Sequence, residues 1–233
     1  SPDFTGALIA QDGVLEFLTY HVNLLPNASE IAIGFPANTN RGLVAFYVRP
    51  EAGNLAEETV VGQNIRVVGE STLTRLGVFR PDHNDVIRFT GNIDLTQFDT
   101  YGNTRSFVLY RGEENTSAET RYENGDTLDE RTFMYLEGSI TGANKRLRVQ
   151  IEQSYSPNNF PNTMNNPTNL QIKAIWTLSG TNTGWSGTLE LGNRQGTDAA
   201  TDGQDSDKES YVRFGRNDGN ATLAISSNVV VVL

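Results

Sequence analysis

The sequence predicts an all-β protein, an antiparallel, jelly-roll-like β-sandwich with long polar loops. Three observations support this prediction. Short segments with alternating or continuous apolar residues follow one another along the chain. Clusters of Gly, Asn, Asp and Pro separate them, and no long segment has helical periodicity. Roughly a dozen short strands with turn signals between them are typical of a sandwich or jelly roll. We therefore expect one domain over residues 1–233.

The N-terminal half contains most of these short segments. Asp12-Gly13 lies between the first two of them and favours a hairpin. The segments 31–35 and 43–48 are apolar on both faces, as expected of strands inside a sandwich or under a neighbouring subunit. The expected strands are residues 7–10, 14–22, 31–35, 43–48, 60–68, 73–79, 86–90, 93–95 and 106–111.

The C-terminal half predicts three hairpins and a final strand. Residues 147–152 alternate between apolar and polar, so one face is expected to be buried and the other wet. The final segment, 229–233, is apolar on both faces. The expected hairpins pair residues 132–140 with 147–152, 170–178 with 185–191, and 211–214 with 221–225.

Composition excludes several classes of chemistry. The formal net charge of −10 argues against binding to nucleic acid or to an anionic membrane surface. The absence of cysteine excludes disulfides, thiolate metal sites and cysteine nucleophiles. No apolar run is long enough for a membrane helix. The chain begins Ser1-Pro2 without Met, which we interpret as a processed mature form or a trimmed polypeptide. The lack of cysteine suits a secreted protein, so we expect an extracellular, cell-surface or virion-surface location.

An acidic loop near the C-terminus is the best candidate for a metal site. Ca²⁺ takes six to eight oxygen ligands, and a flexible loop rich in Asp, Gly and Ser can supply them. The spacing differs from that of an EF-hand, and a solvated acidic loop is the alternative interpretation. The candidate Ca²⁺ ligands are Asp198, Asp202, Asp205, Asp207 and Glu209.

Aromatic and acidic residues leave a carbohydrate-related function open. Trp185, Tyr155 and Phe160 are the candidates for a platform on which sugar rings stack, with Trp185 as a core residue the alternative. Glu137 and Glu152 could form the carboxylate pair of a glycoside hydrolase, or could pair with arginines across the sheet. A polysaccharide lyase would use Tyr and Arg side chains on one face. Serine-nucleophile and nucleotide-binding motifs are absent.

The apolar termini favour self-association. A terminal strand that is apolar on both faces must be covered, either by its own sheet or by the sheet of a neighbour. We therefore expect a non-catalytic structural subunit that forms a filament, shell or surface layer, through terminal-strand exchange and Ca²⁺-stabilised loops. A carbohydrate-binding module or a carbohydrate-active enzyme is the alternative.

Overall fold

The computed structural model describes residues 4–11, 13–19, 27–34, 41–50, 58–69, 71–79, 85–100, 105–113, 129–153, 171–191, 208–215 and 228–232. Within these residues the chain forms strands and no helix, so no helix there could span a membrane. The strands form three faces, which we name sheets A, B and C.

Strands that follow one another in the chain belong to different sheets. Sheet A contains β1 (Leu8–Ala10), β3 (Ile31–Gly34), β6 (Ile65–Val68) and β9 (Ile93–Asp94). Sheet B contains β2 (Gly13–Thr19), β4 (Arg41–Pro50), β7 (Ser71–Phe79), β10 (Phe107–Glu113), β14 (Trp185–Leu191) and β16 (Val229–Val232). Sheet C contains β5 (Thr59–Val61), β8 (Val86–Phe89), β11 (Asp129–Leu136), β13 (Gln171–Leu178) and β15 (Lys208–Phe214). The long strand β12 (Ile140–Gln153) begins in sheet A and continues in sheet B.

All strand pairings among the described residues are parallel, so the predicted antiparallel sandwich is wrong. Each strand pairs with the strand at the same place in the next circuit of the chain, as β3 does with β6 and β4 with β7. Two of the predicted hairpins are also wrong: β11 pairs with β8 and β13 rather than with β12, and β13 and β14 lie in different sheets. The third involves residues 221–225, which lie outside the described residues. The Gly- and Asn-containing turns redirect the chain into another sheet instead of reversing it.

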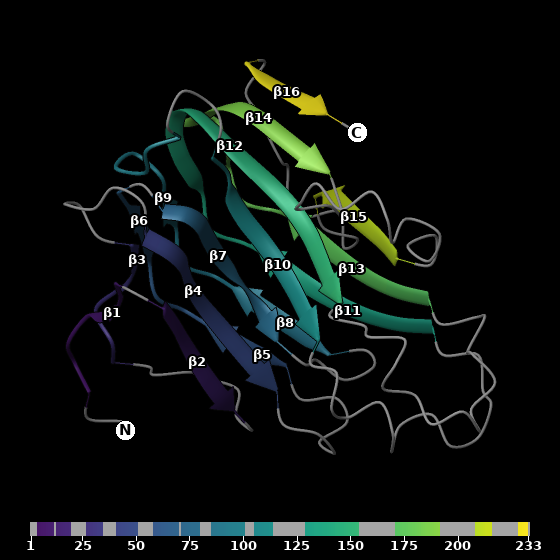
Figure 1. Cartoon of the computed structure of the whole chain (residues 1–233), viewed down its shortest axis with the longest axis horizontal. Coiled ribbons are helices and arrows are strands. Elements are labelled where there is room, and N and C mark those ends of the chain that lie inside the picture. Colours follow the sequence, from purple (N-terminus) through teal and green to yellow (C-terminus); the bar gives the residue numbers. More distant parts are fainter. Residues whose placement is uncertain are drawn as a thin grey trace.

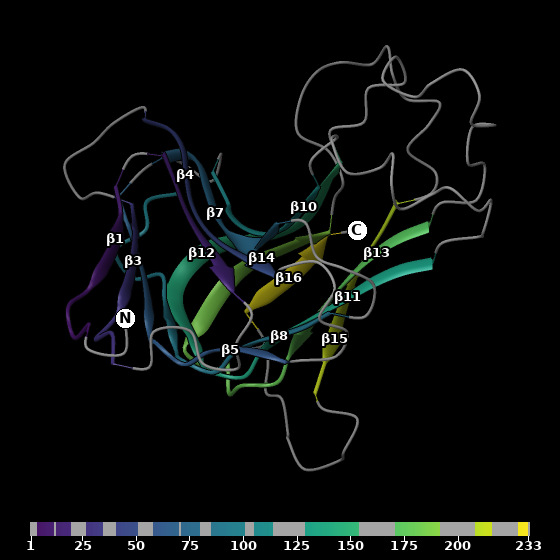
Figure 2. The same cartoon turned by 90° about the horizontal axis from the view of Figure 1, so that it is seen from below.

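The chain winds as a solenoid, a nearly closed tube of parallel strands (Figure 1). One coil passes through sheets A, B and C in turn, and the aligned residues Ile31, Ile65, Ile93 and Ile140 show that coil length varies from 28 to 47 residues. Figure 2 shows sheets B and C as separate walls joined on one side by sheet A. The register therefore predicts columns of side chains that run along the tube, one residue from each coil.

Inward columns build a single core. In sheet A, Ile31, Ile65, Ile93 and Ile140 are aligned and at most 1% exposed. In sheet C, the ring of Trp176 stacks on Phe89 at 6.1 Å, and both side chains are fully buried. Full burial of side chains of this size contributes roughly 1.5–3 kcal/mol each, so the interior of the tube is the main source of stability.

Glycine lines the corner where sheet C leads into sheet A. A Cβ atom on Gly91 would lie 2.0 Å from the carbonyl oxygen of Gln63, and one on Gly138 would lie 2.0 Å from that of Gly91. The next coil repeats the approach, because a Cβ on Gly180 would lie 2.1 Å from the oxygen of Gly138. Successive coils can therefore approach this closely only because no side chain separates their backbones.

Side-chain amides hold the same corner together. The Oδ1 atom of Asn64 accepts a hydrogen bond from the backbone N–H of Asn92 at 2.9 Å, and Asn92 Oδ1 accepts one from Ser139. Asn182 Oδ1 accepts from the backbone N–H of Ile140 at 2.8 Å. These bonds satisfy backbone donors at a turn where no strand partner is available.

Candidate functional site

Among the five predicted metal ligands, only Glu209 lies within the described residues. Glu209 lies in strand β15, opposite Lys173 of β13, rather than in a loop. The candidates Asp198, Asp202, Asp205 and Asp207 lie outside the described residues, as do His21 and His83. The part of the chain that the structure describes holds no group of three His, Cys, Asp or Glu side chains placed to bind a metal ion. The Ca²⁺ site stays a prediction.

Among the three aromatic candidates for sugar stacking, the structure describes Trp185. This side chain is fully buried, and its Nε1–H donates a hydrogen bond to the backbone oxygen of Lys145 at 3.2 Å. A buried ring presents no face to a sugar. Trp185 is therefore a core residue, as the alternative interpretation expected. Tyr155 and Phe160 lie outside the described residues.

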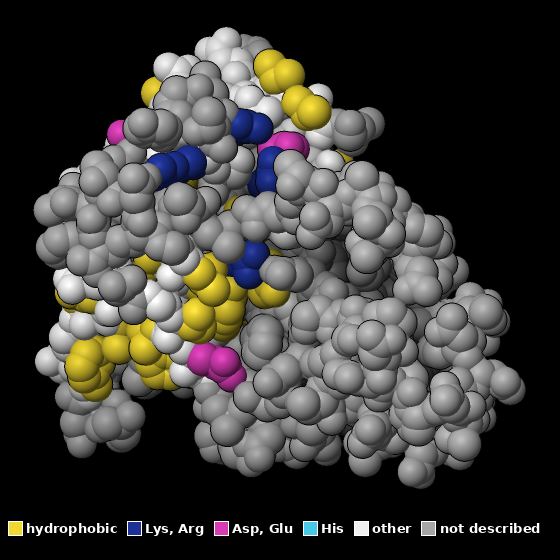
Figure 3. Space-filling model, viewed as in Figure 1, with side chains coloured by type: hydrophobic (Ala, Val, Ile, Leu, Met, Phe, Trp, Pro, Cys, Tyr) yellow, Lys and Arg dark blue, Asp and Glu magenta, His cyan; other side chains and the backbone are white. Residues whose placement is uncertain are grey.

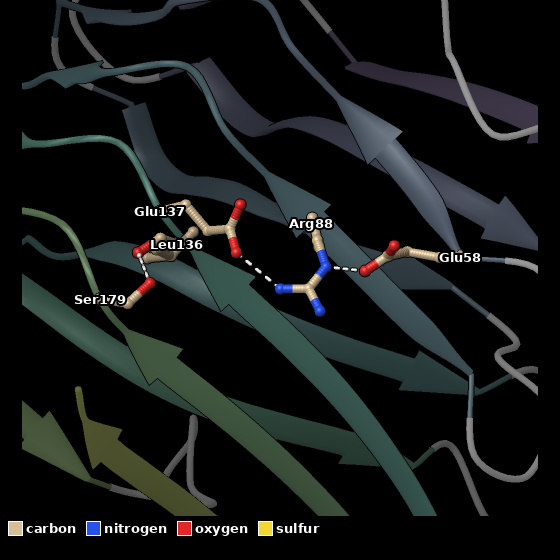
Figure 4. Close-up of polar contacts among 5 residues, drawn as sticks. All are labelled: Glu58, Arg88, Leu136, Glu137 and Ser179. Atoms are coloured by element: carbon tan, nitrogen blue, oxygen red, sulfur yellow. Dashed lines mark hydrogen bonds and ion pairs between the residues drawn. The ribbon is translucent and has the colours of Figure 1, made fainter. Parts of the chain in front are cut away.

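The candidate acid Glu137 belongs to an ion-pair cluster on the outer face of sheet C. Its Oε1 atom accepts a hydrogen bond from Arg88 Nη1 at 2.6 Å, and Arg88 Nε contacts Glu58 (Figure 4). The guanidinium also lies over the ring of Tyr135, with its carbon 4.3 Å from the ring centroid. Since Glu58, Arg88 and Glu137 come from three successive coils, this arrangement links coils and does not leave two carboxylates facing an open site.

Sheet A carries a matching cluster on its outer face. Arg66 Nη2 lies 2.6 Å from Glu30 Oε1, and this hydrogen bond lowers the pKa of the Glu30 carboxyl below its usual value. Asp94 lies beside Arg66 in the next coil. Burial raises the pKa of Asp94. Hydrogen bonds from Thr96 and Thr141 and the charge of Arg66 lower it by a larger amount, so the net shift is downward.

Sheet B has a third cluster, in which one carboxylate faces two arginines. Glu190 Oε1 lies 2.8 Å from Arg148 Nη2, and Glu190 Oε2 lies 3.0 Å from Arg146 Nη2. Burial raises the pKa of Glu190, but the hydrogen bond and charge of Arg148 and the charge of Arg146 outweigh it and lower the pKa. All three faces therefore carry charge pairs that join one coil to the next.

We predict that the Glu190 pair stabilises the protein in a pH-dependent way. Because the pKa of Glu190 is lower in the folded state, the pair contributes its full stabilisation above the ordinary glutamate pKa of 4.5. This stabilisation is lost as the pH falls through the folded-state pKa. A pair of this kind contributes up to about 1 kcal/mol, so Glu190→Gln should lower the thermal midpoint at pH 7 by about 2–4 °C. In melts at successively lower pH, the difference between the variant and the parent should shrink. A difference that does not change with pH would assign the effect to packing.

Tyrosine and arginine also meet on the outer face of sheet B. The rings of Tyr47 and Tyr110 stack at 5.2 Å across Gly77, and Arg75 lies over Tyr110 at 4.2 Å. Arg75 Nη1 donates to the hydroxyl of Tyr47 at 3.4 Å. The side chains are 4–5% exposed, so this cluster offers no accessible Tyr–Arg surface of the kind that a lyase would need.

A charged side chain, that of Arg111, lies inside the tube. Arg111 occupies an inward position of β10 between Val78 and Ile151, is fully buried, and donates a hydrogen bond through Nε to Thr132 Oγ1 at 2.9 Å. The sequence pattern could not identify it, because an arginine in an alternating strand is expected on the wet face.

The two ends of the solenoid differ from its faces. All the large hydrophobic side chains that are exposed among the described residues lie in the first or the last strands or beside them. They are Phe4, Ile9 and Val14 at the N-terminal end, and Phe214, Val230, Val231 and Val232 at the C-terminal end. Figure 3 shows hydrophobic side chains over β16 at the top and around β2 at lower left. The ends are therefore the candidate functional surfaces.

The last strand of sheet B is open on one side. In the described residues β16 pairs with β14 alone, and Val230 is 62% exposed. At the other end β2 pairs with β4 alone, and Val14 is 48% exposed. Sequence analysis identified the apolar segment 229–233, but it could not show that this segment ends a tube.

The fold and its ends define the protein as a parallel β-solenoid with apolar terminal strands. Comparison of the chain with protein-family models, with curated proteins and with solved structures found no match.

Proposed function

We propose that this protein is a non-catalytic structural subunit that associates with copies of itself through the ends of its solenoid. The observation that carries the proposal is the confinement of exposed large hydrophobic side chains to the two ends, in the described part of the chain. Exposed apolar patches of this kind mark interaction surfaces, and an open strand edge is a template for another strand. The cysteine-free composition fits the extracellular, cell-surface or virion-surface location expected above.

The charge clusters support a structural role. Arg88 links coils through two carboxylates, and Glu190 does so through two arginines. These groups are engaged with each other across the coils. They link successive coils along the axis of the tube. A subunit that forms a rod or bears load requires such links.

The mode of association differs from the strand exchange considered above. Strand β16 pairs with β14 of its own chain in parallel, with Thr188 opposite Val230 and Glu190 opposite Val232. No other described strand pairs with its second edge, which we propose receives a neighbouring copy. Covering three valines that are about half exposed contributes roughly 1 kcal/mol each, to which new backbone hydrogen bonds add.

We predict that Val230→Glu weakens self-association. Val230 points to the outer face and is 62% exposed, so glutamate there leaves the folded subunit intact but places a negative charge in the contact. Burial of an unpaired charge should weaken association at least about tenfold. Sedimentation velocity over a range of protein concentrations measures this effect.

The matched control is Gln97→Glu, which adds the same charge at an exposed position near the middle of the tube. This variant should associate like the parent. A parent protein that stays monomeric at every concentration would overturn the proposed function, and equal weakening by both substitutions would assign the effect to net charge.

A further inference from the structure

We infer that association is head to tail, with β16 of one copy adding in parallel to β2 of the next copy. This inference rests on the proposed function and specifies its partner surface. It names the two edges that meet, their relative direction and the side chains that come together.

The pairing of β12 with β14 shifts register between Gly142 and Lys145, and beyond this point sheet B keeps one register across all its strands. A single outward column runs through its seven strands, from Val14 of β2 to Val232 of β16. The residues between them are Ala45, Arg75, Val108, Arg148 and Glu190. The two terminal valines are 48% and 44% exposed, whereas Ala45 and Val108 inside the column are at most 1% exposed.

Head-to-tail addition continues this column with matching chemistry. Val232 of one copy would lie opposite Val14 of the next, so two exposed apolar side chains cover each other. The inward column ends at Gly13 on β2 and at Val231 on β16, which is 48% exposed. Glycine opposite Val231 leaves room for the valine side chain, and Leu15 on β2 is already packed against the core.

Strand direction distinguishes this arrangement from a symmetric dimer. A two-fold axis that paired β16 with β16 would make the two strands antiparallel, whereas every described ladder of sheet B is parallel. Addition of β16 to β2 keeps the parallel ladder and the alternation of inward and outward side chains. Such a contact uses different surfaces on the two copies, so it repeats into a filament unless rotation closes a ring.

The absence of cysteine from the chain allows a direct test. Single variants Val14→Cys and Val232→Cys are mixed under oxidising conditions and separated without reductant. Opposed residues on neighbouring strands lie within the Cα separation of about 4.4–6.8 Å that a disulfide requires. We expect a dimer in the mixture and in neither variant alone, and a ladder of oligomers from the double variant. A mixture of the Gln97→Cys and Val232→Cys variants gives the level of disulfide dimer that random collisions produce.

The outcomes separate the inference from the proposed function. A disulfide dimer from Val232→Cys alone would show tail-to-tail contact, which overturns the head-to-tail inference and leaves self-association standing. Self-association in sedimentation without any disulfide above the Gln97→Cys level would also overturn the inference. A mixed dimer at a level well above that control, with a ladder from the double variant, supports it.

Discussion

Gly138→Ala should be among the most damaging single-methyl changes in this protein. The added Cβ would lie 2.0 Å from the backbone oxygen of Gly91 and 2.4 Å from its carbonyl carbon. Backbone atoms at a corner between two coils cannot rotate away as a side chain can, so the coils must separate. We expect a loss of at least about 3 kcal/mol in the free energy of unfolding, and a thermal midpoint lower by about 6–12 °C. Calorimetry or denaturant unfolding measures both.

Gly62→Ala is the matched control, because Gly62 lies at the same corner two coils earlier. A Cβ there would meet only Thr90 Oγ1, at the ordinary contact distance of 3.7 Å. This variant should match the parent within about 1 kcal/mol. Equal losses from Gly62→Ala and Gly138→Ala would mean that close approach of the coils at Gly138 is not what requires glycine.

Strand positions could be predicted from the sequence, but strand partners could not. Residues 31–35 and 43–48 were expected to be strands, and β3 and β4 occupy these places. Alternation of apolar and polar residues with a period of two shows which side chains point inward. The alternation is identical whether the neighbouring strand is parallel or antiparallel, so it does not identify the partner. The glycine-containing turn at 180–184 is also compatible with both, because a solenoid corner and a hairpin require the same turn residues.

One signal of the parallel arrangement was present in the sequence. All four residues of β3 are buried, as expected of parallel sheets that are covered on both faces. The repeat itself was hidden, because segments of different length connect sheet B to sheet C. The connecting segments 114–128, 154–170 and 192–207 all fall between a strand of sheet B and a strand of sheet C. The last of them contains most of the candidate metal ligands. Variable insertions at one edge are typical of solenoids.

The candidate sites show a similar division. The apolar segment 229–233 was identified from composition, and β16 provides one of the two exposed ends. The clusters around Arg66 and Arg88 could not be found, because their members are separated by 28 to 49 residues and meet only when coils are stacked. Glu137 was expected beside Glu152 or an arginine of the next strand, and its partner is Arg88 of the preceding coil.

Trp185→Ala should also cause a large loss of stability. The side chain is fully buried in the main core, at the start of β14 where the chain enters sheet B. Removing a buried tryptophan costs about 3–5 kcal/mol through the cavity that it leaves. The backbone oxygen of Lys145 also loses its hydrogen bond from Nε1. Denaturant unfolding should show a lower midpoint with an unchanged slope.

Trp185→Phe separates the two contributions. Phenylalanine keeps most of the apolar volume but cannot donate to Lys145, so its cost should be about 1–2 kcal/mol. Because Trp185→Ala acts on folding, a loss of glycan binding in that variant would not identify a sugar-stacking residue. Specific glycan binding that disappeared in Trp185→Ala while the unfolding midpoint stayed at the parent value would contradict the structural role and support the carbohydrate-binding alternative.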